Sequence, residues 1–406
     1  MKFYTTVIAM SLVAIPAFLS ADDWAQFRGA GGVSSASANL PTSFTAEKNI
    51  AWKLPLPAKG ASSPIVVGGK VVVTCSGGEG QDELYTVCVD AETGEKLWTQ
   101  RFWATGRCFV HPLSANAAPT PTSDGKFIYV FYSSNDLACL DLDGNLVWYR
   151  GLAVDFPKAG NDVGMASSPA VKNGVVVVQV ECQGDSFAMG LDARNGTTMW
   201  TQKRSKDAVW TSPLIIEEKD SPAMVVLQTK KNFEVLDLKS GEVVFRVDGE
   251  VSSISSPAVT GGRLFVPVNG TTAYSVSSNG QLTEEWNSPS IRPSSMSTVV
   301  NGDQLFTLNR SGVLTSYNAN DGTELEKIRV IKGSSAWATP VVANGYMYLF
   351  AQGGQSYVVA LSGPERQKSK VVHSFLFQDE VFLGSPAISG NAMFVRSDQF
   401  LWKIAN

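Results

Sequence analysis

The sequence is poor in the residues that many enzymes use for metal binding and nucleophilic catalysis. Its only two histidines, His111 and His373, lie far apart, which argues against a histidine metal site or a catalytic triad. The cysteines include no Cys-x-x-Cys spacing, no adjacent pair and no Cys-x-x-Cys-His haem attachment; they are Cys75, Cys88, Cys108, Cys139 and Cys182. We therefore expect neither a metal site nor catalytic residues of these types.

Charged residues are also scarce. They make up 17% of the chain, and the formal net charge is −4. A protein that binds nucleic acid or an anionic membrane surface usually carries a basic patch and a positive charge. Neither is an expected partner here.

Long apolar runs are absent beyond the N-terminus. Residues 1–20 have the pattern of a secretory signal, with Lys2 before an apolar run from Val7 to Leu19 and small residues at Ser20 and Ala21. The run is shorter than the roughly 20 residues that span a bilayer, and no cysteine follows it for a lipid anchor. We expect an exported, soluble protein, periplasmic or extracellular, with no membrane span.

What the sequence does contain is a repeat. With 36 glycines and 19 prolines, the composition is typical of an all-β protein with many turns. A Ser-Ser-Pro triplet or a variant of it occurs eight times, beginning at Ser62, Ala117, Ser167, Thr211, Ser255, Met296, Ala338 and Gly384. Successive triplets lie 41 to 55 residues apart. This is close to the period of roughly 40 to 50 residues expected for four-stranded propeller blades, so we predict an eight-bladed β-propeller. Seven blades is the alternative, if one weak copy is an insertion.

A second pattern, Asp-x-x-Thr-Gly-x-x-x-Trp, recurs within the same period. It occupies Asp90 to Trp98, and related forms occupy Asp192 to Trp200 and Asp237 to Phe245. The Asp and Gly predict a tight turn between the third and fourth strands, where glycine adopts a positive φ at little cost. The aromatic residue is then predicted to wedge between neighbouring blades. The tryptophans assigned this docking role are Trp52, Trp98, Trp148, Trp200 and Trp286.

The last repeat ends too early to form four strands. After Pro386 the chain stops at residues 402–406, and a fourth strand must come from elsewhere. Residues 49–54 read like the fourth strands of other repeats, so we predict that this N-terminal strand completes the last blade and removes the free sheet edges. The domains are then the signal at 1–20, a lead-in at 21–48 and one propeller at 49–406.

These motifs resemble the tryptophan-docked repeat of the pyrroloquinoline quinone (PQQ) type eight-bladed propellers. Members of that family include PQQ-dependent dehydrogenases and the non-enzymatic outer-membrane assembly lipoprotein BamB, and short bacterial members are similar in size to this chain. The stretch from Asp23 to Gly29 is also similar to the lead-in of many short members. The resemblance covers about residues 49–406 and implies the fold more strongly than the activity, because one scaffold serves catalysts and docking platforms alike.

The loops that follow the second and fourth strands of each blade are the longest and most polar. The longest runs from Arg101 to Asn116, and loops held on a rigid scaffold often carry binding residues. The hypothesis is a pocket near the axis, lined by Arg107, His111, Asn135, Asp162, Glu181 and Asp185, with Trp210 beside them. The alternative is that these side chains cap their own turns and that His111 is structural.

Two functions remain open. The favoured one is a monomeric, non-catalytic platform that binds an envelope protein, a peptide or a glycan, with no cofactor. The alternative is an alcohol or sugar dehydrogenase that uses PQQ and calcium, with Glu181, Asn135 and Asp162 as oxygen ligands and Trp210 as the aromatic floor. The adjacent cysteines that the resemblance implies for the alcohol dehydrogenases are missing.

We expect two kinds of environment for the cysteines, buried positions in the repeat and loops on the polar rim. Cys88 and Cys139 occupy a repeat position that Gly190 and Val235 fill elsewhere, which predicts small buried residues. Cys108 and Cys182 lie in loops on the polar rim, and the sequence leaves open whether they form a disulfide.

Overall fold

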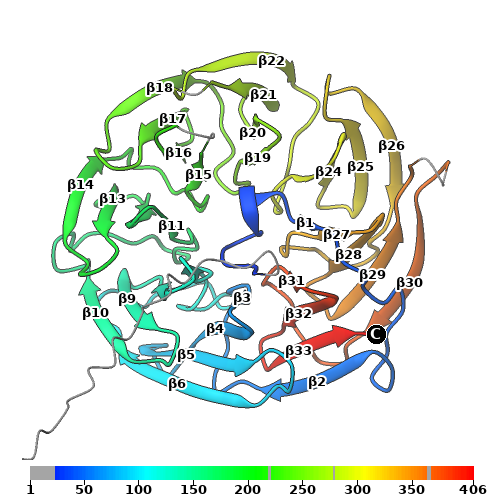
Figure 1. The fold of residues 1–406 in the computed structure, drawn as a ribbon, viewed down its shortest axis with the longest axis horizontal. Coiled ribbons are helices and arrows are strands. Elements are labelled where there is room, and N and C mark those ends of the chain that lie inside the picture. The colour runs from blue at the N-terminus through cyan, green and yellow to red at the C-terminus, as the bar shows by residue number, and fades with distance from the viewer. Residues whose placement is uncertain (1–22, 218–220, 278, 364–366) are drawn as a thin grey trace, which may run out of the picture.

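Each repeat folds into one four-stranded antiparallel meander, and eight such blades surround a central axis (Figure 1). The structure is a computed structural model that describes residues 23–217, 221–277, 279–363 and 367–406. The predicted signal at 1–20 lies outside the described residues. Within them, no helix has the length and apolar character to cross a bilayer. The eight blades confirm the predicted fold, and the seven-bladed alternative is wrong.

The strands of each blade follow the chain outward from the axis. The first blade consists of β3 (Ile65–Val67), β4 (Lys70–Gly77), β5 (Glu83–Asp90) and β6 (Lys96–Trp103), and the second of β7 (Thr122–Ser123), β8 (Phe127–Phe131), β9 (Asp136–Asp141) and β10 (Leu146–Gly151). The third blade consists of β11 (Ala170–Lys172), β12 (Val175–Val180), β13 (Phe187–Asp192) and β14 (Thr198–Lys203), and the fourth of β15 (Leu214–Ile216), β16 (Met224–Gln228), β17 (Asn232–Asp237) and β18 (Val243–Asp248).

Blades five to seven repeat this arrangement, and the eighth takes its outermost strand from the N-terminal part of the chain. The fifth blade consists of β19 (Ala258–Thr260), β20 (Arg263–Val266), β21 (Thr271–Val276) and β22 (Leu282–Ser288), and the sixth of β23 (Val299–Asn301), β24 (Gln304–Leu308), β25 (Val313–Asn318) and β26 (Glu324–Arg329). The seventh blade consists of β27 (Val341–Ala343), β28 (Tyr346–Phe350), β29 (Gln355–Ala360) and β30 (Lys370–Leu376), and the eighth of β31 (Ala387–Ser389), β32 (Ala392–Arg396), β33 (Phe400–Ala405) and β2 (Ile50–Pro55).

The ring closes as predicted. β2 pairs antiparallel with β33, with Trp52 opposite Lys403 and Lys53 opposite Trp402. Figure 1 shows the blue β2 outside the red β33, beside the first blade. This pairing gives the last sheet its fourth strand and covers the β33 edge.

The turn between strands three and four has the chemistry that its sequence predicts. In the first blade, Oδ1 of Asp90 accepts the backbone N–H of Thr93 at 2.8 Å, and Gly94 has φ 76°. Hydrogen bonding to the Thr93 backbone N–H lowers the pKa of the Asp90 carboxyl. The charged form of the side chain therefore stabilises the turn.

The five tryptophans named from the sequence each lie over the turn glycine of the next blade. A Cβ on that glycine would come within 2.5 to 2.8 Å of the indole. Each indole N–H also donates to a backbone carbonyl of the next blade at 2.9 to 3.3 Å. The pairs are Trp52 with Gly94, Trp98 with Gly144, Trp148 with Gly196, Trp200 with Gly241 and Trp286 with Gly322. Glycine is required there because the indole occupies the space of a side chain.

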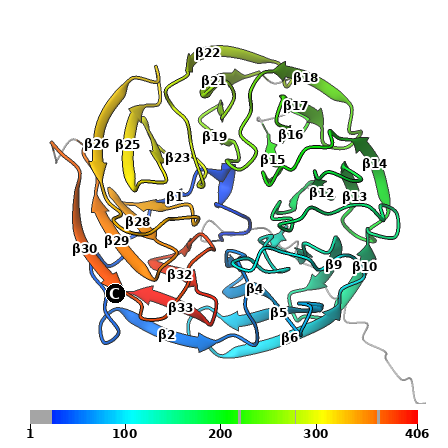
Figure 2. The ribbon, with the colours of Figure 1, turned by 180° about the vertical axis from the view of Figure 1, so that it is seen from behind.

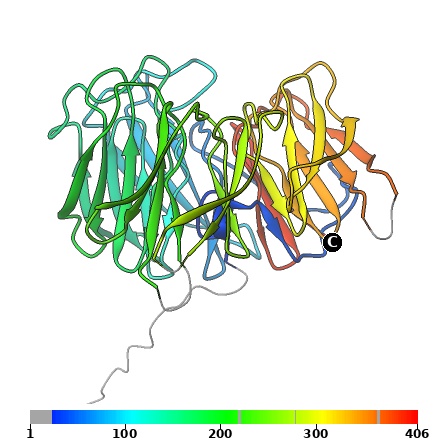
Figure 3. The same ribbon diagram turned by 90° about the horizontal axis from the view of Figure 1, so that it is seen from above.

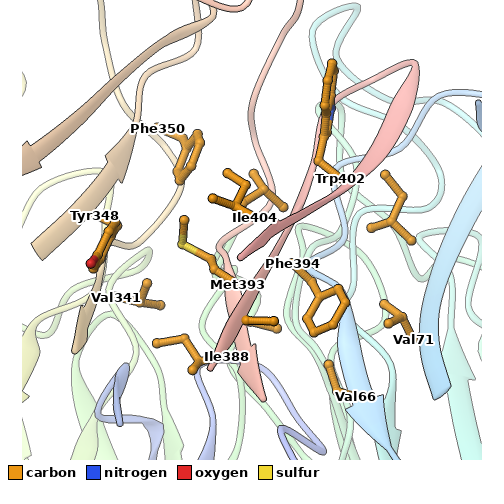
Figure 4. Close-up of a cluster of buried hydrophobic side chains, with 14 of the residues drawn as sticks. Val66, Val71, Val341, Tyr348, Phe350, Ile388, Met393, Phe394, Trp402 and Ile404 are labelled. Atoms are coloured by element: carbon orange, nitrogen blue, oxygen red, sulfur yellow. The ribbon is translucent and has the colours of Figure 1, made fainter. Parts of the chain in front are cut away.

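The hydrophobic core lies between adjacent blades. The largest cluster joins the seventh, eighth and first blades, where Phe350, Met393 and Phe394 are buried (Figure 4). Phe44 of the lead-in is fully buried in the same cluster, with its ring centroid 6.3 Å from that of Phe350. The lead-in is thus part of the core and not a free extension of it.

The lead-in also runs close to the axis, where it appears dark blue in Figures 1 and 2. Trp24 forms a two-residue bridge with Val66 of the first blade, and a short 3₁₀ turn, η1 (Ala30–Gly32), follows. Then β1 (Ser35–Ala36) pairs parallel with β27 of the seventh blade. In the side view of Figure 3, the dark blue lead-in lies in the middle of the molecule, between the green and the orange blades. One segment therefore ties together blades on both sides of the ring.

Candidate functional site

A closed ring of hydrogen bonds surrounds the axis. In every blade the residue that enters the innermost strand has a hydroxyl side chain, and its backbone N–H donates to the hydroxyl oxygen of the corresponding residue in the next blade. The eight bonds measure 2.9 to 3.2 Å. The members of this hydroxyl ring are Ser63, Thr120, Ser168, Ser212, Ser256, Ser297, Thr339 and Ser385. The second residue of the Ser-Ser-Pro repeat therefore links neighbouring blades through a hydrogen bond.

The second blade corrects one detail of the sequence repeat. The triplet starting at Ala117 predicts Ala118 as the ring member, but Thr120 takes that place. Alanine has no hydroxyl to accept the N–H of Ser63, whereas Thr120 has one. Thr120 also precedes a proline, Pro121, as do six of the other seven ring members; Ser297 precedes Thr298. The true second copy is therefore residues 119–121, two positions later than predicted.

The hydroxyl ring lines a funnel-shaped cavity of about 400 Å³ on the axis. All eight ring residues line it, together with Phe27 of the lead-in. Apolar side chains from the long loops form the walls, chiefly Leu113, Val163, Met165, Trp210, Ile254, Trp337 and Leu383. We call this cavity the funnel. Its size is within the usual range for a ligand pocket.

The funnel carries almost no charge. Among the described residues that line it there is no aspartate, glutamate, lysine or arginine, and His111 is its single titratable side chain. Nδ1 of His111 accepts the backbone N–H of Leu113 at 3.1 Å. The two indoles in the wall are held by hydrogen bonds, from Trp210 to the carbonyl of Gly164 at 2.8 Å and from Trp337 to Oε1 of Gln352 at 3.2 Å. The aromatic walls are therefore fixed in place.

Of the seven residues predicted from the sequence to form a binding site, His111 and Trp210 line the funnel. Arg107 and Asp162 meet each other instead. Their ion pair measures 3.1 Å, with half of the Arg107 side chain and 82% of the Asp162 side chain exposed. Arg107 also lies over the ring of Phe109 at 5.2 Å. The pair belongs to the outer surface of the long loops, where water screens it.

Asn135, Glu181 and Asp185 contact neighbouring loops and strands and do not line the funnel. Asn135 is buried with φ 66° and donates to the carbonyl of Ala159 at 3.3 Å. Asp185 accepts the backbone N–H of Lys158 at 3.0 Å. These two side chains hold loops together, as the structural alternative predicts for short polar residues.

Glu181 is a buried ion-pair partner. Its Oε1 is 2.8 Å from Nε of Arg204, which also contacts Glu234. Burial raises the pKa of the Glu181 carboxyl, and the Arg204 guanidinium opposes that rise. Because one of its oxygens is engaged by Arg204 and the side chain is fully buried, Glu181 is not free to bind a ligand in the funnel.

The same contacts show whether the predicted oxygen ligands could hold a calcium ion beside PQQ. Calcium needs several oxygen ligands around one point. Glu181 is paired with Arg204 and Asp162 with Arg107. Oδ1 of Asn135 has no hydrogen-bond partner, but Asn135 does not line the funnel, so the three oxygen ligands do not meet there. No group of three His, Cys, Asp or Glu side chains suited to a metal occurs in the described ranges. The residues present do not fit the cofactor, and we derive no chemistry from it.

The cysteines are separate thiols. Cys88 and Cys139 are fully buried, as their repeat position predicts. Cys108 and Cys182 do not form a disulfide: Sγ of Cys182 accepts the backbone N–H of Gly160 at 3.3 Å, and Cys108 contacts the carbonyl of Gly106. Burial raises the pKa of the Cys108 thiol to about 11, so it is not a reactive thiolate at neutral pH.

Sequence reasoning missed most of the funnel wall. Leu113, Trp337 and Leu383 were not singled out, because nothing near them in the chain distinguishes them from core residues. The hydroxyl ring had a signal, since the second position of the triplet is Ser or Thr in seven of the eight copies as first aligned. A repeated hydroxyl beside proline at the start of an innermost strand predicts polar groups that face the axis.

Fold and repeat together define an eight-bladed propeller of the tryptophan-docked class. A model of the family described as outer membrane protein assembly factor BamB matches residues 33–153, 83–228 and 210–405, which is nearly all of the described chain. The chain belongs to this family.

Two curated relatives carry the name outer membrane protein assembly factor BamB. The protein from Moranella endobia (strain PCIT) is 24% identical over 227 residues, which cover 54% of this chain and 52% of the relative. The protein from Salmonella typhimurium (strain LT2) is 24% identical over 226 residues, covering 54% and 51%. The chain thus spans about half the length of the curated relatives it matches.

Solved structures share the fold at low identity. BamB from Moraxella catarrhalis is 14% identical with a TM-score of 0.63, covering 88% of this chain and 97% of its own. Quinohemoprotein alcohol dehydrogenase from Comamonas testosteroni is 10% identical with the same TM-score, covering 94% and 80%. Because a BamB protein and an alcohol dehydrogenase give the same TM-score at such low identity, these likenesses concern the fold alone.

Proposed function

We propose that this protein is an exported, monomeric and non-catalytic assembly factor for outer membrane proteins. It binds a segment of another envelope protein at the mouth of the funnel. The name of the two curated relatives supports the process, and the composition of the funnel supports the mode of binding. The predicted signal at residues 1–20 supports export.

The observation that carries this proposal is a group of exposed apolar side chains around the funnel mouth. Leu113 is 57% exposed, Trp337 43% and Val163 41%, and all three line the cavity. Exposed apolar patches beside a pocket are typical of protein-binding sites, and tryptophan is enriched among the residues that contribute most to binding.

The residues that line the funnel do not favour an enzymatic function. A dehydrogenase requires a base to remove the substrate proton. The charged candidates from the sequence lie elsewhere or are bonded to their own loops. The described funnel wall contains no carboxylate, and its one titratable side chain, His111, already accepts the backbone N–H of Leu113 at Nδ1. A surface that is apolar, held rigid and open to one side is suited to receiving a side chain of a partner.

The proposal is tested by genetic complementation in the organism that encodes the protein. Deletion of the gene is expected to lower the amount of folded β-barrel protein in the outer membrane, and the wild-type gene is expected to restore it. The variant Leu113→Glu/Trp337→Glu places two charges at the funnel mouth and is expected to fail, because burying them against an apolar partner is costly.

The matched control is Val243→Glu/Leu325→Glu. Both residues are exposed to a similar degree, 44% and 52%, but they lie on the outermost strands β18 and β26. This control is expected to restore assembly at the wild-type level, with both proteins present in equal amounts. An unchanged outer membrane after deletion would refute the assembly role, and equal behaviour of the two variants would refute the funnel mouth as the binding surface.

A further inference from the structure

The hydroxyl ring has hydrogen-bond donors that the fold does not use. Each of the eight hydroxyl oxygens accepts one backbone N–H from the preceding blade. Within the described residues, the ring hydroxyls act only as acceptors and none donates its own hydrogen to a protein atom. A serine or threonine hydroxyl has one donor and two acceptor positions, so the donor remains available in every blade.

These donors are collected in one place. The eight side chains are buried, with exposed fractions of 2% to 8%, and all of them line the funnel. A buried polar group without a partner is costly, so such donors favour a bound group that accepts hydrogen bonds. The floor of the funnel therefore offers donors, while its walls offer apolar contact.

A buried cation lies next to this floor. Arg28 of the lead-in is 2% exposed, and its guanidinium donates to three backbone carbonyls, those of Ser256, at 3.1 Å, Pro257 and Gly32. Nε of Arg28 is buried with no partner, and no ion pair joins Arg28 to a carboxylate in the described part of the chain. Burial lowers the pKa of Arg28 to about 9, which leaves it protonated at neutral pH.

Arg28 and part of the hydroxyl ring line the same small cavity. A second, small cavity is lined by Arg28, Phe27 and the ring residues Ser168, Ser212 and Ser256, and the last four also line the funnel. Arg28 is thus hydrogen-bonded to the backbone of one ring residue, Ser256, and lines a cavity with three of them. The guanidinium is neutralised only by backbone carbonyls and by no carboxylate within the described residues, and such a buried positive charge favours an anion nearby.

We propose that the funnel floor binds a carboxylate group carried by an apolar or aromatic stem. The hydroxyl ring donates to the carboxylate oxygens, Arg28 supplies the favourable charge, and Trp210 and Trp337 enclose the stem. The free C-terminus of a protein chain and a small organic acid both have this chemistry. The first source rests on the proposed function, because the chain end then belongs to the docked envelope protein.

The test compares an acid with its amide on the same wild-type protein. Two fluorescently labelled hexapeptides that end in leucyl-phenylalanine, one with a free carboxylate and one with a C-terminal amide, are titrated with purified protein by fluorescence anisotropy. Hydrogen bonds to a charged group are worth enough that the free acid is expected to bind about tenfold or more tightly than the amide. Equal affinities, or no binding of either peptide, would overturn the proposal.

A competition arm separates the two sources. Unlabelled 3-phenylpropanoate has the same aromatic carboxylate without a peptide chain. If it displaces the peptide with a similar affinity, the natural ligand is a small organic acid; if it binds about tenfold more weakly, the ligand is a chain end. Either result supports carboxylate binding. If amide and acid bind equally well, the carboxylate inference fails while the funnel mouth remains a docking surface, so the two proposals can be told apart.

Variants locate the site. Ser256→Ala removes one ring donor and is expected to weaken binding of the acid peptide severalfold while leaving the amide peptide unchanged. Ser255→Ala is the matched control, because Ser255 is the adjacent buried serine, lies outside the funnel lining and has no hydrogen-bond partner for its hydroxyl. Circular dichroism confirms that both variants are folded. Equal acid binding by both variants would place the carboxylate away from the ring and overturn the proposal.

Discussion

The backbone N–H of Ser385 donates to Oγ of Ser63 at 2.9 Å, and this bond joins the last blade to the first across 322 positions of sequence. It completes the hydroxyl ring. Arg396 makes a second link at the same seam, because its Nη1 donates to the carbonyl of Thr74 at 2.6 Å and to Oγ of Ser62 at 2.9 Å. Hydrogen bonds near the axis therefore stabilise ring closure, in addition to the pairing of β2 with β33 at the outer edge of the last blade.

Removing the acceptor at this seam should weaken the closure. In Ser63→Ala the buried N–H of Ser385 loses its partner, and we expect the free energy of unfolding to fall by about 1–3 kcal/mol. Ser167→Ala is the control, since the equally buried Ser167 hydroxyl has no partner, and its loss should change little. Urea unfolding measures both. If Ser63→Ala is as stable as wild type, the ring bond contributes nothing.

The docking of an indole on the next blade should be a major source of stability. Trp200 is 7% exposed and its N–H donates to the carbonyl of Leu238 at 2.9 Å. Trp200→Ala should cost about 3–5 kcal/mol, because it removes this bond and leaves a cavity beside Gly241. The neighbouring Met199 is 40% exposed, and Met199→Ala should stay within about 0.5 kcal/mol of wild type. Thermal and urea unfolding would contradict the docking role if both variants behave alike.

The lead-in should detach when its contact with the fifth blade is blocked. Gly31 has φ 63°, and a Cβ there would lie 2.2 Å from the carbonyl oxygen of Val259. Gly31→Ala should therefore cost more than Gly69→Ala, where φ is 73° but nothing lies within 4 Å. The control carries only the backbone penalty of roughly 1–2 kcal/mol.

Limited proteolysis and hydrogen exchange measure this detachment. In Gly31→Ala, residues 24–44 should become sensitive to protease and exchange faster, while Gly69→Ala keeps the wild-type pattern. Protection of residues 24–44 in both variants would show that the turn tolerates the added methyl group and that the contact with Val259 does not hold the lead-in in place.

Acid should weaken one specific turn. Hydrogen bonds, first from the Arg194 side chain and then from its backbone N–H, lower the pKa of the Asp192 carboxyl from its usual 3.8 to about 2. A carboxyl whose pKa is lower in the folded state stabilises the protein above its unfolded pKa and loses that contribution as the pH falls through its folded pKa. Asp192→Asn should therefore be less stable than wild type near pH 7, and the difference should shrink between about pH 4 and pH 2.

Chemical denaturation of both proteins at several pH values checks this expectation. The difference between the two is the informative quantity, because other carboxyls titrate in the same range and affect both proteins equally. A difference that stays constant down to pH 2 would mean that the charge of Asp192 is not what holds the turn.

The blades were predictable because their signals are local. Asp90 and Gly94 specify a turn within five residues, and the following Trp98 meets the next turn of the same kind. The missing fourth strand of the last blade also left a visible gap, which the strand around Trp52 fills. The misplaced second triplet shows the limit, because Pro119 and Pro121 both fit the pattern and only the hydrogen bond to Ser63 distinguishes them.

The site was less predictable because its members come from every blade. Polarity in a loop does not reveal whether a side chain faces the axis: His111 does, whereas Glu181 turns inward to Arg204 and Asp162 outward to Arg107. Each outcome depends on a neighbour in another loop. No property of one segment decides it.

The sequence by itself favoured eight blades and indicated their strand order and the strand that closes the ring, since turn chemistry and a regular repeat act over short distances. Only the tertiary structure decided what meets at the axis. Eight hydroxyls from eight repeats and the Arg28 side chain come together there because the ring closes, and closure brings side chains hundreds of positions apart within hydrogen-bond reach.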